Sequence, residues 1–175
     1  DALVAAAGFI NKVPEIVKEY GNEFTVATVG TIKVTPHSVN VIPGTCTFSL
    51  EIRDQSAEVM KLIENHLRQL LEDICEKYGV TATFVPTSYH DPAPMSELVR
   101  GTIEEAVKEL GIDYTVIPSG AFHDSLIMTS VFPTGMIFVP SKDGISHSRY
   151  EYTAPEDIEN GCNVLLNTVL KLDEK

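Results

Sequence analysis

Two short turns in this sequence place a histidine next to small residues and hydroxyl groups. The first is Ser119-Gly-Ala-Phe-His-Asp124, and the second, Lys142 to Glu151, contains His147. An imidazole nitrogen can ligate a metal ion, and the backbone N–H groups of a turn rich in small residues can meet an anion or a developing oxyanion. A single histidine specifies no metal site, so a surface histidine in a polar loop is the simpler interpretation of either turn alone.

The first turn offers a second kind of chemistry through His123 and Asp124. This pair could polarise a water molecule or hold a neighbouring ligand in place. Alternatively, Asp124 and Ser125 cap the short helix that follows. Both turns come directly after apolar segments that resemble strands, and the carboxyl ends of parallel strands meet at one edge of a sheet. We therefore expect the two turns to open on the same edge.

Arg53 and Asn40 are the other candidate ligand-binding residues. A guanidinium can hold a carboxylate through two parallel hydrogen bonds, and an asparagine amide adds a donor. The alternative for Arg53 is a surface ion pair with Glu51 or Asp54, which contributes little to stability. The sequence contains no Gly-x-Ser-x-Gly motif, and Ser146 and Ser148 have no base at a fixed spacing, so a serine hydrolase is disfavoured.

The elements that must position these residues change in character near residues 90–95, a proline-rich junction. Before it, apolar spacings predict a helix-strand-strand-helix-strand order, typical of a ferredoxin-like unit that lacks its first strand. Within it, Cys46, Phe48, Leu50 and Ile52 share one face of a half-buried strand. The predicted elements are helix 2–19, strand 24–35, strand 45–53, helix 56–78 and strand 81–86.

After the junction the pattern is α/β, so we predict two units, residues 1–93 and 94–175. The apolar segment 135–139 is typical of a parallel strand covered on both faces. A capping box at 153–156 is expected to begin the last helix. Two strands and three helices are too few to close a core, and this unit is therefore expected to be part of a domain. Its predicted elements are helix 96–110, strand 114–117, helix 125–130, strand 135–139 and helix 153–172.

Charge and cysteine content exclude several classes of partner. The 175 residues carry 13 Lys and Arg against 25 Asp and Glu, a formal net charge of −12, which disfavours binding to nucleic acid and to anionic membrane surfaces. No apolar run is long enough to span a bilayer. Cys46, Cys75 and Cys162 are odd in number and lie in apolar stretches, so we expect buried free thiols and a reducing, cytoplasmic location.

Three linked segments resemble one enzyme family. Gly30-Thr-Ile-Lys-Val-Thr-Pro-His-Ser-Val-Asn-Val-Ile-Pro-Gly44, continuing through Phe48 to Asp54, resembles the lid-domain signature of dinuclear-metal amidohydrolases and exopeptidases. Ser119 to Ser125 and Met136 to Ser148 are similar to the two C-terminal motifs of its hydantoinase/carbamoylase branch, which includes N-carbamoyl-L-amino-acid hydrolase, β-ureidopropionase and allantoate amidohydrolase. The resemblance covers nearly the whole chain.

The resemblance implies a fold and an activity. Residues 1–93 would be a lid and homodimerisation domain, and residues 94–175 the C-terminal portion of an α/β zinc-exopeptidase-like catalytic domain. The intact enzyme would hydrolyse a linear amide such as an N-carbamoyl amino acid or a ureido acid. It would use two divalent ions per subunit, zinc or else manganese, cobalt or nickel, to activate a bridging water.

Residue roles also follow from the resemblance. His147 corresponds to the last metal ligand, and His123 and Asp124 lie in the pocket or behind its ligands. Asn40 and Arg53 correspond to the lid residues that bind the carboxylate of a small-molecule substrate, while the pocket is lined by Ser119, Gly120 and Ala121. The chain departs from the family at Phe122, where glycine is usual, and at Arg149, where proline is frequent.

The family's remaining metal ligands and its general-base glutamate belong to an N-terminal segment with no counterpart in this sequence. We therefore expect a fragment that lacks the N-terminal part of the catalytic domain, holds no metal pair by itself and is inactive alone. The alternative is a non-catalytic dimerisation or binding module that has retained the lid fold.

Overall fold

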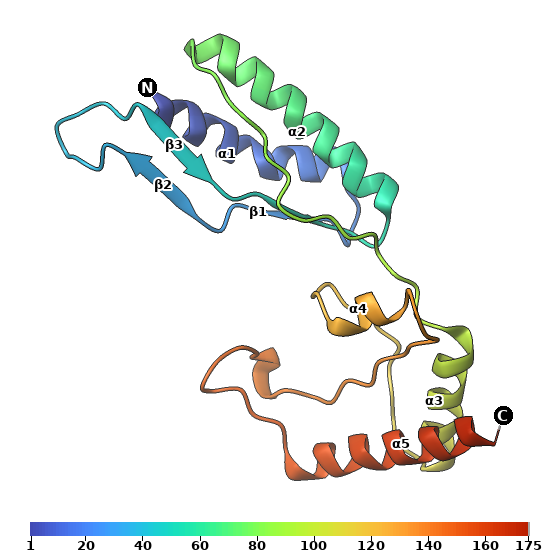
Figure 1. Ribbon diagram of the computed structural model, residues 1–175. Helices are drawn as coiled ribbons and strands as arrows, with labels where there is room; N and C mark the ends of the chain where they lie inside the picture. The colour runs from blue at the N-terminus through green and yellow to red at the C-terminus, as the bar shows by residue number, and fades with distance from the viewer. Residues whose placement is uncertain (175) are drawn as a thin grey trace. The chain divides into compact units, whose positions relative to one another are not determined.

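The computed structural model describes residues 1–174, which fall into two compact units. The first unit is Asp1–Pro92 and the second begins at Ala93, one residue before the division that the sequence predicts. Helices and short strands mix in the α/β manner expected (Figure 1). Among the described residues, no helix combines the length and the apolar character needed to cross a membrane. The first unit contains α1 (Ala2–Tyr20), β1 (Val26–Thr28), β2 (Ile32–Thr35), β3 (Thr45–Phe48), β4 (Glu51–Arg53) and α2 (Ala57–Tyr78).

The four strands form an antiparallel ribbon in two halves. β1 pairs with β4, with Ala27 opposite Ile52, and β2 pairs with β3, with Val34 opposite Cys46. Each of the two long strands that the sequence predicts is therefore interrupted once. The predicted alternation holds across the interruption, because Cys46, Phe48, Leu50 and Ile52 are all half-buried while the residues between them are exposed.

The interruption is unequal on its two sides. Three residues, 29–31, separate β1 from β2, whereas only Ser49 and Leu50 separate β3 from β4. The backbone N–H of Ser49 donates to the carbonyl of Thr31 at 3.1 Å, and the N–H of Thr31 donates to the Ser49 hydroxyl at 3.0 Å. The Thr31 N–H thus bonds to a serine hydroxyl where a regular ladder would offer it a backbone carbonyl. The extra residue in 29–31 and this local change resemble a β-bulge.

The core of the first unit lies between α1, α2 and one face of the ribbon. Phe9, Ile63 and Leu67 are almost completely buried, and the Phe9 ring lies 5.5 Å from that of Phe48. Helix α1 continues through Pro14. The Ser56 hydroxyl caps α2 at its start, and Gly79 ends it with φ 62°, a left-handed conformation that favours glycine.

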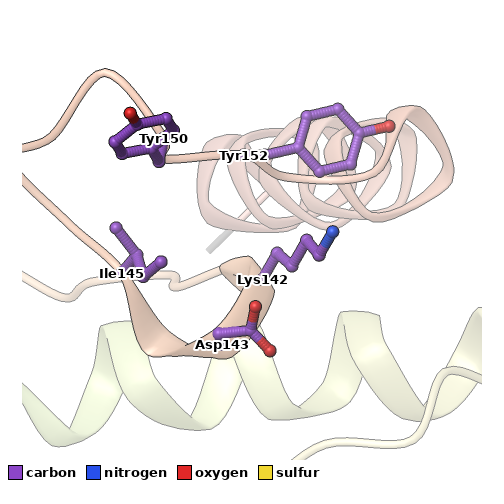
Figure 2. A pocket seen from close by; sticks show the side chains of 5 residues that line it. All are labelled: Lys142, Asp143, Ile145, Tyr150 and Tyr152. Atoms are coloured by element: carbon purple, nitrogen blue, oxygen red, sulfur yellow. The ribbon is translucent and has the colours of Figure 1, made fainter.

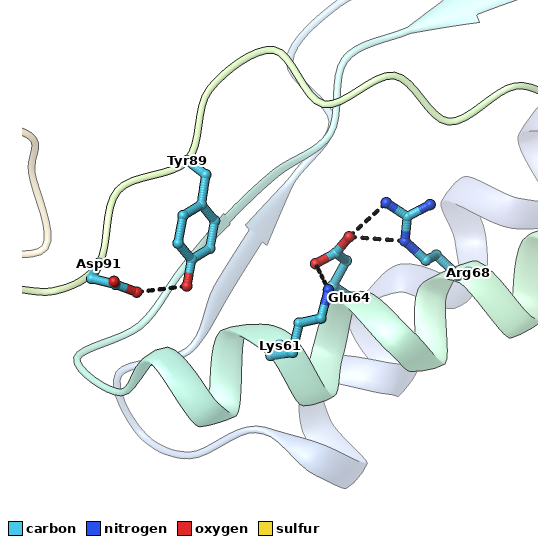
Figure 3. Close-up of polar contacts among 5 residues, drawn as sticks. All are labelled: Lys61, Glu64, Arg68, Tyr89 and Asp91. Carbon is cyan, nitrogen blue, oxygen red and sulfur yellow. Dashed lines mark hydrogen bonds and ion pairs between the residues drawn. The ribbon is translucent and has the colours of Figure 1, made fainter.

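The segment after α2 is held against that helix by side chains. The Arg68 guanidinium lies over the Phe84 ring, 3.9 Å from its centre. It also binds Glu64, which accepts from Lys61 at 2.9 Å; Figure 3 shows these two ion pairs of Glu64. Hydrogen bonding from Lys61, and then from Arg68, lowers the pKa of Glu64. The predicted strand 81–86 is wrong, because this segment makes side-chain contacts without a backbone ladder to any described strand.

The second unit is built on two packed helices, α3 (Glu97–Glu109) and α5 (Pro155–Asp173), with the short α4 (Asp124–Met128) and the 3-10 turn η1 (Lys142–Gly144) between them. The buried residues are small, namely Thr102, Ala106, Val107, Val164 and Thr168. The hydroxyls of Thr102 and Thr168 each donate to the carbonyl four residues earlier, which satisfies them inside the core.

The predicted strands 114–117 and 135–139 are not formed among the described residues. Both segments lack a neighbouring strand, and a strand requires inter-strand hydrogen bonds. Segment 135–139 nevertheless packs closely on the helices: a Cβ at Gly135 would lie 2.7 Å from Val99, and one at Gly161 would lie 2.5 Å from Val139. Large apolar side chains stay exposed, among them Val116, Ile117, Phe138, Leu166 and Leu170.

Two further details differ from the sequence-based expectations. Helix α5 begins after Ala154 with Pro155 in its first turn, so Thr153 does not cap it and the predicted capping box is not formed. All three cysteines are free, but none is fully buried: Cys46 and Cys75 are half-buried and Cys162 is exposed. Burial raises the pKa of the Cys46 thiol.

Asp54 links three parts of the first unit. Its carboxylate accepts from the Thr25 hydroxyl at 2.5 Å, from the Ser56 N–H at 2.8 Å and from the Asn22 amide at 3.3 Å. Burial opposes ionisation, but these hydrogen bonds outweigh it, and the pKa of Asp54 is lowered. The carboxylate therefore ties the residues after α1 to the turn that begins α2.

We predict that Asp54→Ala lowers the free energy of unfolding by about 1–3 kcal/mol at neutral pH, because three donors lose a charged acceptor. The lowered pKa makes this stabilisation complete above about pH 4, and it is lost as the pH falls through the folded-state pKa. Chemical denaturation as a function of pH measures both effects. Asp73→Ala on the exposed side of α2 is the control, and equal losses in the two variants would contradict the role of Asp54.

Candidate functional site

The loop that carries His147 is closed by its own hydrogen bonds. The Lys142 N–H donates to the Tyr152 carbonyl at 2.8 Å, which joins the two ends of the loop. Near its start, the Ser141 hydroxyl donates to the carbonyl of Ile145 at 2.5 Å. The loop is therefore a closed structure with a fixed place for the residues at its tip.

His147 lies at that tip in an unusual backbone conformation. Its φ is 54°, a left-handed value that is uncommon outside glycine, and Asp143 in the same loop has φ 57°. The His147 N–H donates to the Glu151 carboxylate at 2.8 Å, which holds this conformation. The imidazole is exposed and makes no hydrogen bond or ion pair with another described residue. It is thus available to a ligand.

A hollow of about 480 Å³ lies beside this tip. Figure 2 shows the rings of Tyr150 and Tyr152 on one side of it, with Ile145 and Asp143 on the other and Lys142 at its border. The Arg149 guanidinium lies over the Tyr150 ring, 4.7 Å from its centre. The hollow offers aromatic surface together with charges of both signs.

The other histidine turn is organised around Ser119. The Ser119 hydroxyl lies 2.9 Å from Nε2 of His123 and also accepts from the Ala121 N–H at 3.3 Å. The His123 ring meets the edge of Phe138 at 5.7 Å, which places the turn against the 135–139 segment. Asp124 is exposed at the first residue of α4, and His123 occupies the capping position without a side-chain cap.

Arg53 ends β4 with its side chain on the exposed face of the ribbon. The guanidinium donates to the Glu51 carboxylate at 2.7 Å, and this bond raises the pKa of Arg53. About half of each side chain is exposed, at 46% for Arg53 and 58% for Glu51. The ion pair that the sequence offered as the alternative is therefore present in this chain, and it is a weak one.

Asn40 and Arg53 lie toward opposite ends of the ribbon. Asn40 belongs to the loop that joins β2 to β3 and extends beyond them, where its amide oxygen accepts from the Ser38 hydroxyl at 2.8 Å (Figure 1). Arg53 is the last residue of β4, and the eight residue steps from Thr45, at the start of β3, span roughly 26 Å at about 3.3 Å per step. The structure thus does not bring these two predicted carboxylate-binding residues together.

The described residues contain no group of three or more His, Cys, Asp or Glu side chains that could hold a metal ion. A catalytic zinc site takes three protein ligands and leaves one position open. The donor set of the described chain therefore does not fit a two-ion centre, and His147 is one candidate ligand of an incomplete set.

Some features of these turns were not predicted from the sequence. The hydrogen bond between Ser119 and His123 spans four residues of irregular backbone, where no periodic pattern indicates a contact. The hollow gathers Lys142, Tyr150 and Tyr152 through loop closure. The only sequence signal for it was the density of aromatic and charged residues around the candidate ligand.

Comparison with known proteins gives consistent matches. The profile described as Peptidase family M20/M25/M40 matches residues 6–171. An N-carbamoyl-L-amino acid amidohydrolase of Geobacillus stearothermophilus is 38% identical over 98% of this chain and 42% of its own length. An allantoate amidohydrolase of Bacillus subtilis is 33% identical over 98% of this chain and 42% of its own length.

A solved structure agrees in fold. The crystal structure of an amidase of the hydantoinase/carbamoylase family from Burkholderia vietnamiensis superposes with a TM-score of 0.90 and 33% identity, over 98% of this chain and 41% of that one. The present chain thus spans about two fifths of the length of the proteins that it matches.

Proposed function

The chain belongs to peptidase family M20/M25/M40, and we propose that it forms part of a metal-dependent amidohydrolase acting on a linear amide. The substrate class proposed is an N-carbamoyl amino acid or a ureido acid such as allantoate. The observation that carries this proposal is the match of nearly the whole chain to relatives with those two activities in their names.

The exposed His147 imidazole supports a role as one metal ligand. Loop closure and the Glu151 hydrogen bond hold its backbone, while the ring has no described polar partner. We propose that the other ligands and the general base come from the part of the protein outside this chain. The same part would cover the apolar side chains that the second unit leaves exposed, such as Val116 and Leu166.

We predict that a protein containing this chain and its N-terminal region hydrolyses N-carbamoyl amino acids or allantoate and retains about two divalent ions per subunit after gel filtration. Residues 1–175 alone, supplied with zinc, manganese, cobalt or nickel, are expected to be inactive. In the longer protein, His147→Ala loses bound metal and activity, whereas His90→Ala keeps both.

Metal analysis and an assay of product release measure these outcomes. Turnover by the 175-residue chain, abolished by His147→Ala, would contradict the incomplete set of ligands. A longer protein without bound metal or turnover would favour the non-catalytic binding module instead.

Arg53 is proposed to bind the substrate carboxylate. Its side chain lies on the exposed face of β4, where the half-exposed ion pair with Glu51 is weak. A substrate carboxylate can therefore replace that of Glu51. For the longer protein, Arg53→Ala is predicted to cost about 2–5 kcal/mol of transition-state binding. This corresponds to a fall in kcat/KM of roughly thirty- to several-thousand-fold. Arg53→Lys recovers part of it, since an ammonium cannot form the two-point contact.

The matched control is Glu51→Gln, which breaks the same ion pair but leaves the guanidinium in place. It is expected to keep kcat/KM and to change the free energy of unfolding by less than about 1 kcal/mol. The measurement compares a substrate that carries the carboxylate with one that carries a neutral amide there. Equal losses for both substrates in Arg53→Ala would rule out carboxylate binding.

We also propose a homodimer formed through the first unit. The ribbon halves are two-stranded, so the outer edges of the described strands are open to another chain, and Val26 and Ile32 are about half exposed. Asn40 and Arg53 lie far apart along the ribbon of one subunit. If both contact the same substrate, the simplest arrangement takes Asn40 from one subunit and Arg53 from the other. Sedimentation equilibrium of the longer protein at micromolar concentration is expected to give twice the subunit mass, and a strictly monomeric mass would contradict the dimer.

A further inference from the structure

The hydroxyl of Ser119 has three polar neighbours but only one hydrogen to donate. It accepts from the Ala121 N–H at 3.3 Å, lies 3.4 Å from the Ala121 carbonyl oxygen and lies 2.9 Å from Nε2 of His123. A serine hydroxyl carries one hydrogen and accepts through its lone pairs. Its hydrogen can therefore go to the Ala121 carbonyl or to His123, but not to both.

The distances favour His123 as the acceptor. The Ala121 carbonyl, at 3.4 Å, lies beyond the usual range of about 2.5–3.0 Å for a hydrogen bond between a hydroxyl and an oxygen, whereas Nε2 of His123 lies at 2.9 Å. With Ser119 donating to Nε2, the neutral ring must carry its proton on Nδ1, because the hydrogen bond made by one ring nitrogen decides the state of the other.

The second nitrogen of His123 remains open. The ring meets Phe138 edge-on, and no described residue accepts a hydrogen bond from Nδ1. Both His123 and Ser119 are half-buried, so the ring is held on one side and accessible on another. A donor that is fixed in direction and has no acceptor in the described part of the chain can serve a bound molecule.

We propose that Ser119 is a positioning residue: it holds His123 as the Nδ1–H tautomer, so that Nδ1 donates a hydrogen bond to an oxygen of the bound substrate. The inference rests on the proposed hydrolase function and deepens it. It gives Ser119 a role that acts through His123 and moves the direct contact with substrate to the imidazole. Among substrate groups, the oxygen of the scissile amide gains negative charge during hydrolysis, so a fixed donor stabilises it more in the transition state than in the ground state.

The test uses the longer protein with ¹⁵N-labelled histidine. Long-range ¹H–¹⁵N correlation at about pH 8.5, roughly two units above the usual histidine pKa, identifies the tautomer of each neutral ring without substrate. The unaltered protein is expected to show His123 with its proton on Nδ1. Ser119→Ala shifts it toward the Nε2–H form and lowers kcat about tenfold with little change in KM. Ser119→Thr, which keeps the hydroxyl, restores both.

Ser130→Ala is the matched control. It removes a hydroxyl that donates to the Ile127 carbonyl just beyond α4, and it should change neither the tautomer nor kcat. An Nε2–H ring in the unaltered protein, or an unchanged tautomer in Ser119→Ala, would overturn the proposal. A shifted tautomer with unchanged kcat overturns the donor role. The tautomer is read without turnover, so failure of the proposed function is a separate result: a protein that hydrolyses none of the substrates.

Discussion

Extended backbone must find hydrogen-bonding partners, and the two units differ in how far they meet this requirement. In the first unit, each strand of the ribbon meets an antiparallel neighbour, and α1 and α2 cover one face of it around Phe9 and Leu67. In the second unit, segments 114–117 and 135–139 have no neighbouring strand among the described residues, and the buried side chains there belong to helix α3 and helix α5. The buried core of that unit is correspondingly small.

Side-chain periodicity predicted the elements whose stability is local. The helix predicted over 56–78 is α2, with Ser56 as its cap and Gly79 at its end, because the determinants of both termini lie within the helix and its flanking residues. The prediction of a strand at 135–139 rested on composition alone. Apolar composition indicates burial, but it does not supply the neighbouring strand that a sheet requires. The prediction of a strand at 81–86 was wrong for a different reason. The contact between Arg68 and Phe84 attaches this segment to α2 through side chains.

The same distinction between local and long-range features applies to the candidate site. The two histidine turns could be identified from residue types, and both are formed by hydrogen bonds within a few residues, as Ser119 with His123 and His147 with Glu151 show. The resemblance also pointed to Asn40 and Arg53, which are thirteen positions apart in the sequence. Sequence spacing does not give the direction of the ribbon between them, and the structure places them toward opposite ends.

The unequal interruption of the ribbon follows from the number of residues in its two strands. Ala27 and Val34 both face the helices although seven positions separate them, an odd number that an unbroken strand would place on opposite faces. The extra residue in 29–31 is left out of the ladder, and this restores the common facing of the two halves. Cys46 and Ile52, which lie opposite Val34 and Ala27, are only six positions apart. A strand shortened by one residue within 29–31 would match that number and could pair without an interruption, so the bulge is a consequence of one added residue, whatever its side chain.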